Sequence, residues 1–583
     1  MGAGATLSAR ISHGRWRGLT RLGPDRLAWI ALAGLLVVGA AFLYYETRGT
    51  TLWTDEWTWA LERRGGGLDT FLKPHNGHFS LIPVALYKLL FATAGLGDHG
   101  PYRAMVIAGH LGCVALVFAY VKRRVGSYLA LLAAALFLFL GPGWHNILWP
   151  FQIAWLLSLA AGLGALLMLD RGDRLGNVGA CALLAISLAS SGLGLAIALG
   201  LAVDVLWGRR RWGHAWIVAA PLAVYALWWI GYEDANYFLR HNIVVAPGFV
   251  ADAAASAISA LAGLTEATGL RPDTPLAWGR PLAVLAVLVL LWRLAATRPV
   301  PPRVLTLLTI VLSFWTLTAL NRAQISTPFE SRYIYVGAFF VLLLAAEVAR
   351  GTRLPRRAAP LLAAVVAVAI VSNLGVLRDN ARFLQGQAQL AKADLAAVEI
   401  GRSVARRDLV LTTFPAFPFL VVKVGPYLAA EKAIGSPAAT PAELAREPEA
   451  ARRVADLTLI DIHRIHLLPA ARGLRPGPQP GVEAAAGGSV VRRGGCVAFV
   501  PAGATTADAS HQLDVAVPAA GLVVTAQGGP VTVSVRRFAD EFLPVGRLSA
   551  SASAVLRIGP DLSGRPWHAR VAPTDRATVC GVG

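Results

Sequence analysis

The chain has 583 residues, of which 55% are hydrophobic and only 15% are charged, and its formal net charge is +20. A water-soluble protein could not bury that much apolar surface, and several charge-free runs approach the roughly 20 residues that cross about 30 Å of hydrocarbon. The positive charge does not indicate a nucleic-acid partner, because the arginines stand in short clusters between hydrophobic runs and not in one basic domain with interleaved aromatic residues.

The first element is a basic segment, residues 1–26, followed by a hydrophobic run at residues 27–45. This run lacks a convincing small-residue cleavage site, so we expect it to remain as a signal anchor, with residues 1–26 in the cytoplasm. Placing every later cluster of Arg and Lys on the cytoplasmic side gives about eleven spans. Because that number is odd, the sequence predicts a multi-pass cell-membrane protein with an extracytoplasmic C terminus. The predicted spans are 27–45, 102–121, 127–143, 150–169, 175–191, 192–207, 214–231, 280–296, 303–320, 333–349 and 359–377.

Two apolar stretches have alternative interpretations. Residues 176–207 form either one long helix or two short helices broken at residues 190–192, and we predict the broken form because it keeps both flanking basic loops inside. Residues 79–96 could span the membrane, but we expect an interfacial helix along the outer leaflet, since a span would move the basic cluster at 122–124 outside. The transmembrane domain, 27–377, then has outer loops at 46–101, 232–279 and 321–332.

Beyond the last predicted span the composition changes. Residues 378–472 are predicted as an extracytoplasmic mixed α/β segment, with short strands at 409–412 and 457–460. Residues 473–488 are rich in Gly, Pro and Ala and are predicted as a linker. From residue 489 to 583, alternating apolar runs separated by Gly, Pro and Asp predict a β-sandwich-like domain.

The four cysteines fall into two pairs by location. Cys113 and Cys181 lie inside apolar helices and are most simply packing residues. Cys496 and Cys580 bracket the β-rich segment, and an extracytoplasmic location would allow them to form a disulfide. The alternative is two unpaired thiols, and we favour the disulfide.

The first outer loop contains an acidic pair, Asp55 and Glu56, about ten residues beyond the first span and beside Trp53, Trp57 and Trp59. A carboxylate partly shielded by aromatic side chains has a raised proton affinity and can take a proton from a hydroxyl nucleophile. The alternative is a solvated acidic pair within an aromatic belt at the membrane surface.

The acidic pair is followed by HNGHFSLIPVALYKLL and then by YRAMVIAGHLGCVALVFAYVKRRVG. This order resembles the opening of the GT-C superfamily of polyprenyl-phosphate-sugar-dependent glycosyltransferases, mainly over residues 27–170. In that superfamily the first outer loop carries the catalytic acid motif, two helices lie along the membrane, and the second span ends in a short basic turn before a Gly. The chain supplies these features in the same order, with residues 122–126 as the basic turn. It departs from the pattern where His75-Asn76-Gly77-His78 stands in place of the common His-Pro-Pro.

The resemblance implies a GT-C-like helical membrane domain with an extracytoplasmic C-terminal domain. It also implies an inverting transfer, in which Asp55 deprotonates an acceptor hydroxyl while the lipid phosphate leaves the anomeric carbon, with Glu56 as the second acidic residue of the motif. The donor would be a polyprenyl-phosphate-linked sugar, the acceptor a cell-envelope glycan or protein, and no further cofactor is expected.

A departing phosphate needs cations near the outer leaflet. Arg322 and Arg332 are the leading candidates because they flank the short outer loop, and Arg240 in the long outer loop is a weaker one. For Arg322 and Arg332, the alternative is ordinary contact with lipid headgroups at helix ends.

Further polar residues in outer loops are candidates for substrate binding. His75 and His78 could reach one metal ion if helical, but a third ligand is not obvious, so substrate hydrogen bonding or simple polarity at a helix start is preferred to a divalent metal. The outer turn GPGWHNILWPFQ combines polar groups with aromatic faces, which suits a sugar and equally suits a membrane interface. Its candidate residues are His145, Asn146, Trp149 and Gln152.

Three functions remain open from the sequence. The first is the transferase, and the second is a transporter or flippase for lipid-linked glycans that uses the same cavity without bond cleavage. Charged residues in the middle of spans would favour a transporter, but Asp204 and Glu347 lie near predicted cytoplasmic helix ends. The third is a glycan-binding envelope scaffold, which leaves the acidic first loop unexplained.

Overall fold

The computed structural model describes residues 23–207, 212–232, 239–265, 276–296, 300–352, 355–411, 421–470, 477–502 and 511–582. Most of the predicted basic segment 1–26 and the first part of the predicted linker therefore lie outside the described residues. The chain divides into two compact units, which are described separately. Unit one comprises Met1–Arg48, Glu62–Thr93 and His99–Gln385, and unit two comprises Gly49–Leu61, Ala94–Asp98 and Gly386–Gly583.

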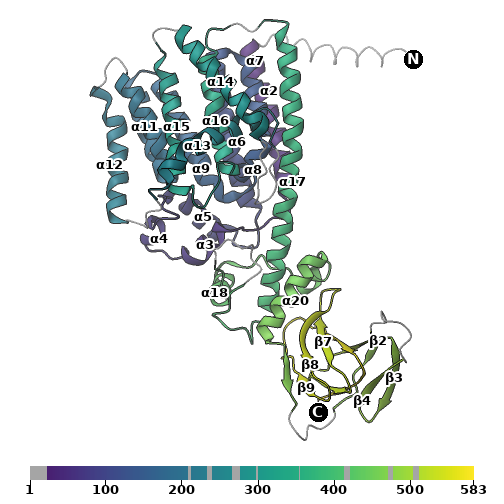
Figure 1. Cartoon of the computed structure of the whole chain (residues 1–583). Helices are drawn as coiled ribbons and strands as arrows, with labels where there is room; N and C mark the ends of the chain where they lie inside the picture. Colours follow the sequence, from purple (N-terminus) through teal and green to yellow (C-terminus); the bar gives the residue numbers. More distant parts are fainter. Residues whose placement is uncertain are drawn as a thin grey trace, which may run out of the picture. The chain divides into compact units, whose positions relative to one another are not determined.

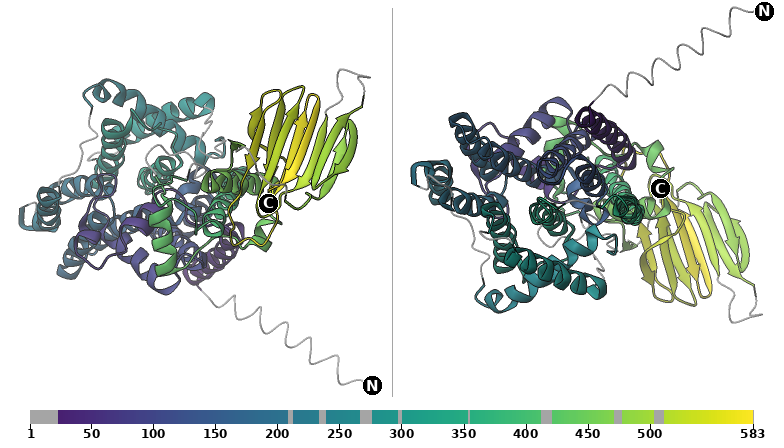
Figure 2. Two further views of the ribbon diagram at one scale, coloured as in Figure 1. Left: turned by 90° about the horizontal axis from the view of Figure 1, so that it is seen from below. Right: turned by 90° about the horizontal axis from the view of Figure 1, so that it is seen from above.

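Unit one is a bundle of α-helices (Figure 1), and many of these helices are seen end on in Figure 2. The single helix α17 begins in unit one and ends in unit two. The described elements are α2 (Pro24–Glu46), α4 (Asp69–Leu72), α5 (Leu81–Thr93), α6 (Gly100–Val125), α7 (Ser127–Leu138), η1 (Gly141–Gly143), α8 (Trp144–Leu148), η2 (Pro150–Gln152), α9 (Ile153–Leu169), α10 (Arg174–Ser190), α11 (Leu193–Trp207), η3 (Trp212–His214), α12 (Trp216–Gly231), α13 (Asn242–Leu261), α14 (Leu276–Ala296), α15 (Pro302–Arg322), α16 (Ser331–Val348) and α17 (Ala358–Ile400).

Eight helices among the described residues are long and apolar enough to cross a membrane: α2, α6, α9 and α13 to α17. The pair formed by α7 and the helical segment that follows it, bent by 55°, would be a ninth. The chain is therefore a multi-pass membrane protein. Each predicted span coincides with an apolar helix, although α7, α10, α11 and α12 have only 12, 17, 15 and 16 residues.

The stretch 176–207 is two helices, as predicted. The helix α10 ends at Ser190, Ser191 is extended with φ −164° and ψ 153°, and α11 begins at Leu193. Gly192 lies at the break, where a Cβ atom would stand only 2.6 Å from Nδ1 of His78. The helix break therefore requires glycine at position 192, because the imidazole of His78 lies too close to the backbone there for any side chain. The predicted interfacial stretch 79–96 contains α5, whose 13 residues are too few to cross a bilayer alone.

The predicted outer loop 232–279 contains a 20-residue helix, α13, which the sequence did not indicate as a span. Both ends of α13 are bonded to neighbouring helices. Asn242 donates hydrogen bonds to Leu320 O and Gln324 Oε1, at 2.8 and 2.6 Å, at the last turn of α15 and just beyond it. At the other end, Asn373 of α17 donates to Ala260 O at 3.1 Å. Gly263, just beyond α13, lies against Ala369 of α17, so α13 packs on α15 at its first residue and on α17 at its last turn.

Unit two combines helices with a β-sandwich (Figure 2). One sheet has the strand order β1-β9-β6-β11-β4-β3 and the other β2-β5-β10-β7-β8, with antiparallel pairing throughout the described strands. The elements are α3 (Asp55–Glu62), α18 (Val424–Ile434), α19 (Pro441–Leu444), α20 (Glu449–His463), β1 (Leu467–Pro469), β2 (Val482–Ala486), β3 (Gly488–Arg493), β4 (Cys496–Pro501), β5 (Gln512–Ala516), β6 (Leu522–Gln527), β7 (Val531–Arg536), β8 (Leu543–Leu548), β9 (Ser553–Leu556), β10 (His568–Pro573) and β11 (Arg576–Gly581).

The sandwich confirms the predicted architecture of the C-terminal domain, but its boundaries differ from the prediction. Strand β1 comes from the predicted mixed segment and pairs with β9, and strand β2 lies inside the predicted linker and pairs with β5. The predicted strand 457–460 was wrong, because these residues belong to α20. Of the predicted strand 409–412, only Val410 forms an isolated bridge, to Lys423, and residue 412 lies outside the described residues.

The predicted disulfide between Cys496 and Cys580 is confirmed, with a Cα–Cα separation of 4.2 Å. The two cysteines are directly opposite each other on the adjacent strands β4 and β11. Cys113 is a free, buried thiol and Cys181 a free, partly buried one, which agrees with their interpretation as packing residues.

Candidate functional site

The HNGH motif forms a tight two-residue turn between α4 and α5. Asn76 and Gly77 have φ values of +52° and +76°, the positive-φ pair that a type I′ turn requires. The backbones of His75 and His78 exchange hydrogen bonds, with N···O distances of 3.1 and 2.9 Å. The helical spacing on which the metal alternative depended is therefore absent at this motif. Among the described residues, no group of three or more His, Cys, Asp or Glu side chains is arranged to hold a metal ion.

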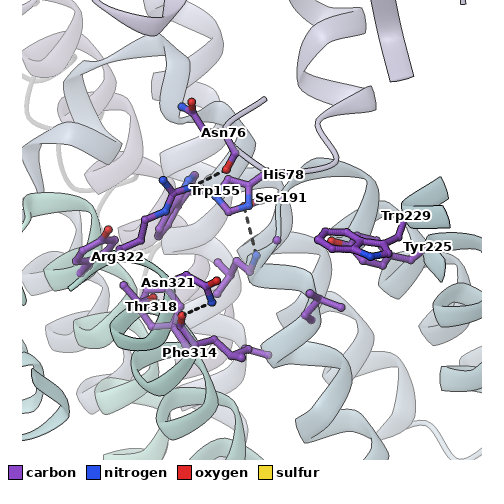
Figure 3. Close-up of a pocket in the computed structure, with 17 residues that line it drawn as sticks. Asn76, His78, Trp155, Ser191, Tyr225, Trp229, Phe314, Thr318, Asn321 and Arg322 are labelled. Carbon is purple, nitrogen blue, oxygen red and sulfur yellow. Dashed lines mark hydrogen bonds between the residues drawn. The ribbon is translucent and has the colours of Figure 1, made fainter. Parts of the chain in front are cut away.

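Four residues that the sequence suggested separately act together at this turn: His75, His78, Arg322 and Arg332. Burial first, and then the electrostatic influence of Arg322, His75 and Arg332, lower the pKa of His78 from 6.5 to about 3. His78 is therefore neutral at physiological pH and can serve as a hydrogen-bonding group without adding charge. Arg322 holds the turn directly, since its NH2 donates to the Asn76 carbonyl at 2.6 Å (Figure 3).

A cavity of about 210 Å³ opens beside this turn. In Figure 3, Asn76, His78 and Arg322 lie on one side of the cavity, and Tyr225 and Trp229 lie on the other. The helix break contributes Ser191 and Gly192 to the wall. The full lining is Asn76, Gly77, His78, Trp155, Ser191, Gly192, Leu193, Leu195, Ala196, Tyr225, Trp229, Phe314, Leu317, Thr318, Asn321, Arg322 and Tyr333.

The cavity is chemically two-sided. Of the described residues that line it, only Arg322 is charged at neutral pH, and it stands beside the amide groups of Asn76 and Asn321. The rest of the wall is mostly aromatic and aliphatic, including Trp229 and Leu317. An anionic headgroup attached to an apolar chain is the kind of ligand that such a cavity accommodates.

The turn GPGWHNILWPFQ is buried along its whole length, as is every residue from 140 to 154. Gly141 permits a close approach, because a Cβ atom there would lie 2.1 Å from the carbonyl oxygen of Asn373. The backbone NH of His145 donates to Ser331 Oγ at 2.9 Å. Such a broken run of short helical turns is tolerated at membrane depth where it is buried within the protein.

An aromatic chain links this turn to the HNGH motif. The ring of His75 meets Phe151 edge-on at 5.3 Å, Phe151 stacks on Trp149 at 5.1 Å, and Trp149 contacts His145 at 5.5 Å. Within the turn, Asn146 and Gln152 are 0% and 1% exposed, and all four of their amide oxygen and nitrogen atoms lack a hydrogen-bond partner in the part of the chain that the structure describes.

Asp55 and Glu56 belong to unit two, where they form the first turn of α3. Glu56 is fully buried, and its Oε2 accepts a hydrogen bond from the backbone NH of Trp53 at 2.9 Å. Asp55 is partly exposed. Glu56 therefore has a structural bond to its own loop.

No protein-family model matches the chain, and no curated protein matches it. Among solved structures, the chain is similar to ArnT from Cupriavidus metallidurans bound to undecaprenyl phosphate, with 15% identity over 64% of this chain and 81% of that one and a TM-score of 0.40. It is similar to the arabinosyltransferase EmbB from Mycobacterium smegmatis, with 14% identity over 96% of this chain and 65% of that one and a TM-score of 0.38. A third is the oligosaccharyltransferase AglB from Archaeoglobus fulgidus in complex with an inhibitory peptide and a dolichol-phosphate, with 14% identity over 65% and 58% of the chains and a TM-score of 0.36.

ArnT, EmbB and AglB are GT-C glycosyltransferases. Because each TM-score is below 0.5, we infer the function of the chain from its own residues.

Sequence reasoning missed several residues of the cavity. Ser191 and Gly192 were recognised only as a helix break, Thr318 lies at the end of a predicted span, and Asn321 is the first residue of a predicted outer loop. A break flanked by small polar residues inside an apolar stretch is the signal that could have pointed to them. Arg240, predicted to meet a phosphate, is exposed near the start of α13 and does not line the cavity.

Proposed function

We propose that the chain is a membrane glycosyltransferase of the GT-C type, which moves a sugar from a polyprenyl-phosphate donor to a cell-envelope acceptor on the outer face of the membrane. The observation that carries this proposal is the two-sided cavity, in which Arg322 and neutral His78 stand at one side and aromatic and aliphatic side chains form the other. Undecaprenyl phosphate, the lipid bound in the similar ArnT structure, serves as the test ligand.

The charges around the cavity suit a phosphate. Arg322 and Arg332 both act on His78 electrostatically, so their positive fields overlap at the turn. A guanidinium donates charge-assisted hydrogen bonds to phosphate oxygens, and partial burial strengthens them. The apolar side of the cavity would receive the first isoprenoid units of the lipid.

The proposed reaction inverts the anomeric carbon. The acceptor hydroxyl oxygen attacks that carbon, its proton passes to the Asp55 carboxylate, and the bond from carbon to phosphate oxygen breaks. The phosphate keeps the bonding electron pair and leaves as polyprenyl phosphate, with its charge stabilised by Arg322 and Arg332. Glu56 supports the loop through its bond to Trp53.

The proposed orientation has the N terminus in the cytoplasm and the C-terminal domain outside. The Cys496–Cys580 disulfide supports this orientation, because disulfides persist in oxidising compartments. A reporter fused after residue 377 should therefore be active only outside the cytoplasm, and cytoplasmic activity would contradict the orientation.

The test is undecaprenyl phosphate binding to the purified chain in lipid nanodiscs. Arg322→Ala should weaken binding by about 10- to 100-fold, because a hydrogen bond to a charged group contributes about 1.5–3 kcal/mol. The matched control is Arg382→Ala, since Arg382 is 73% exposed and pairs with Asp379 at 3.1 Å. Binding that both variants retain at the wild-type level would refute the phosphate site, and thermal melts establish that Arg322→Ala still folds.

A further inference from the structure

The strongest unexplained feature of unit one is a pair of amide side chains in the turn between α7 and α9. Asn146 on α8 and Gln152 at the end of η2 are almost completely buried. Neither the oxygen nor the nitrogen of either amide has a hydrogen-bond partner in the described residues. Buried polar groups are nearly always paired, so two unpaired amides six residues apart require an explanation.

A purely structural role explains these two amides poorly, because leaving them unpaired costs free energy of folding. Leaving a buried donor or acceptor unpaired is more unfavourable than replacing the side chain by an apolar one of the same shape. Two other buried polar residues of unit one, Ser158 and Ser187, show the usual solution, because their hydroxyls bond to each other at 2.9 Å. The amides of the turn differ in that both of their functions, donor and acceptor, are unused.

The surroundings indicate what would satisfy them. The amides share their turn with Trp149, which stacks on Phe151, and with His145, which contacts Trp149. Aromatic faces beside amide donors and acceptors match a sugar, whose C–H faces pack on rings and whose hydroxyls both donate and accept. The ring of His75 touches Phe151, so the turn adjoins the motif that lines the proposed phosphate cavity.

We propose that Asn146 and Gln152 bind hydroxyl groups of the transferred sugar and thereby select it. The inference rests on the proposed function, since it assigns the sugar end of the same donor whose phosphate meets Arg322. In the ligand-free chain the amide atoms are inaccessible, so the turn opens by side-chain rearrangement when the sugar binds. A site built around hydroxyl partners strongly rejects analogues that lack them, because the buried amides would then stay unpaired.

The experiment uses the full chain in nanodiscs and two kinds of probe. One is undecaprenyl phosphate without a sugar, and the other is the same lipid phosphate bearing each of a panel of hexoses and pentoses. The variants are Asn146→Leu and Gln152→Met, which keep side-chain shape but remove the hydrogen bonds. The control is Ser158→Ala, which breaks a satisfied buried pair outside the turn.

The expected result has two parts. Without ligand, both amide variants melt at a higher temperature than the wild type, whereas Ser158→Ala melts lower. With ligand, at least one sugar-bearing lipid binds the wild type more tightly than the bare lipid; this gain in affinity is the sugar increment. In each amide variant the increment is about tenfold smaller, while the bare lipid binds normally. The control keeps the increment.

Two outcomes overturn the inference while leaving the proposed function standing: bare lipid binds, but the variants keep the sugar increment, or no sugar gives an increment in the wild type. Melting temperatures that fall in both variants would also overturn it, because they would show that the amides are satisfied by ordered water. Failure of the bare lipid to bind the wild type would instead count against the proposed donor pocket.

Discussion

The lowered pKa of His78 predicts how the free energy of unfolding should change with pH. Desolvation first, and then the electrostatic influence of Arg322, His75 and Arg332, lower the pKa of His78 from 6.5 to about 3. The unfolded chain protonates this imidazole near pH 6.5, whereas the folded chain does not. The stability contributed by the neutral imidazole is therefore fully present above pH 6.5 and is lost as the pH falls from 6.5 towards 3.

The size of the effect at pH 5 depends little on the folded pKa. Between pH 6.5 and 5 the unfolded state holds one more proton than the folded state at this residue, so each pH unit removes about 1.4 kcal/mol. Over 1.5 units His78 should thus cost about 2 kcal/mol of the free energy of unfolding, as long as its folded pKa lies below about 4.

The assay compares the wild type with His78→Gln, which keeps polarity but does not titrate. Unfolding free energies are measured in mixed micelles by titration with a denaturing detergent at pH 7.5 and pH 5. The wild type should lose about 2 kcal/mol more than His78→Gln over this interval. His241→Gln serves as the control, because His241 is exposed beside α13. Equal losses in the wild type and His78→Gln would refute the proposed environment of His78.

Three further predictions concern other parts of the chain. Asp55→Asn should lower transfer by about 100-fold or more while undecaprenyl phosphate still binds, as product formation and lipid binding measured side by side will show. Glu56→Gln should lower the melting temperature, because its carboxylate accepts the Trp53 NH at 2.9 Å. Replacing Cys496 and Cys580 together by Ala opens a loop with a sequence separation of 84 residues and should destabilise the sandwich by up to about 4.5 kcal/mol, which hydrogen exchange of β4 and β11 can measure.

The spans were predictable because hydrophobicity is a local property of the sequence. Every predicted span has a helix at its position, and the helix break at residues 190–192 followed from the positions of the flanking basic clusters. The helix α13 was not predicted by this reasoning from hydrophobicity and basic clusters. Its length and composition qualify it as a candidate span, whereas the placement of the basic clusters had assigned its residues to an outer loop.

The error at residues 457–460 has a similar origin. A four-residue stretch with three apolar residues suits a strand or a helix equally well, and the surrounding polar residues decide between them. In α20, Asp456 accepts hydrogen bonds from the backbone NH groups of Arg537, Phe538 and Ala539, at 2.8 to 3.1 Å. That contact joins residues about 80 positions apart, so the sequence around residue 457 could not have shown it.

The candidate site was predictable in its residue types but not in its grouping. Outer-loop histidines and arginines were selected as polar groups near the membrane surface, and His75, His78, Arg322 and Arg332 do influence one another. The contribution of Gly192 needed the folded chain, because only there does His78 approach the helix break. The unpaired state of Asn146 and Gln152 is likewise a property of packing and not of sequence.

The charges of unit one help to separate a transferase from an ion-coupled transporter. In the described ranges, Glu347 is the one buried carboxylate of unit one, and it bonds to Tyr120 at 2.5 Å and to Arg124 at 2.8 Å. Arg124 also pairs with Asp170, and Arg303 pairs with both Asp170 and Asp204. These groups gather at the predicted cytoplasmic ends of the helices and neutralise one another there.

A coupled transporter needs an ionisable group that changes partners along the substrate path. The described charged network does not meet that need, because its members bind each other at one end of the bundle, away from the Arg322 cavity at the other. His110, within α6, is also engaged, with Tyr335 OH at 2.8 Å and Leu138 O at 3.0 Å. A passive flippase remains the competing reading, and it differs from the transferase in chemistry: it would return the lipid-linked glycan intact, whereas the transferase must release polyprenyl phosphate for every sugar it transfers.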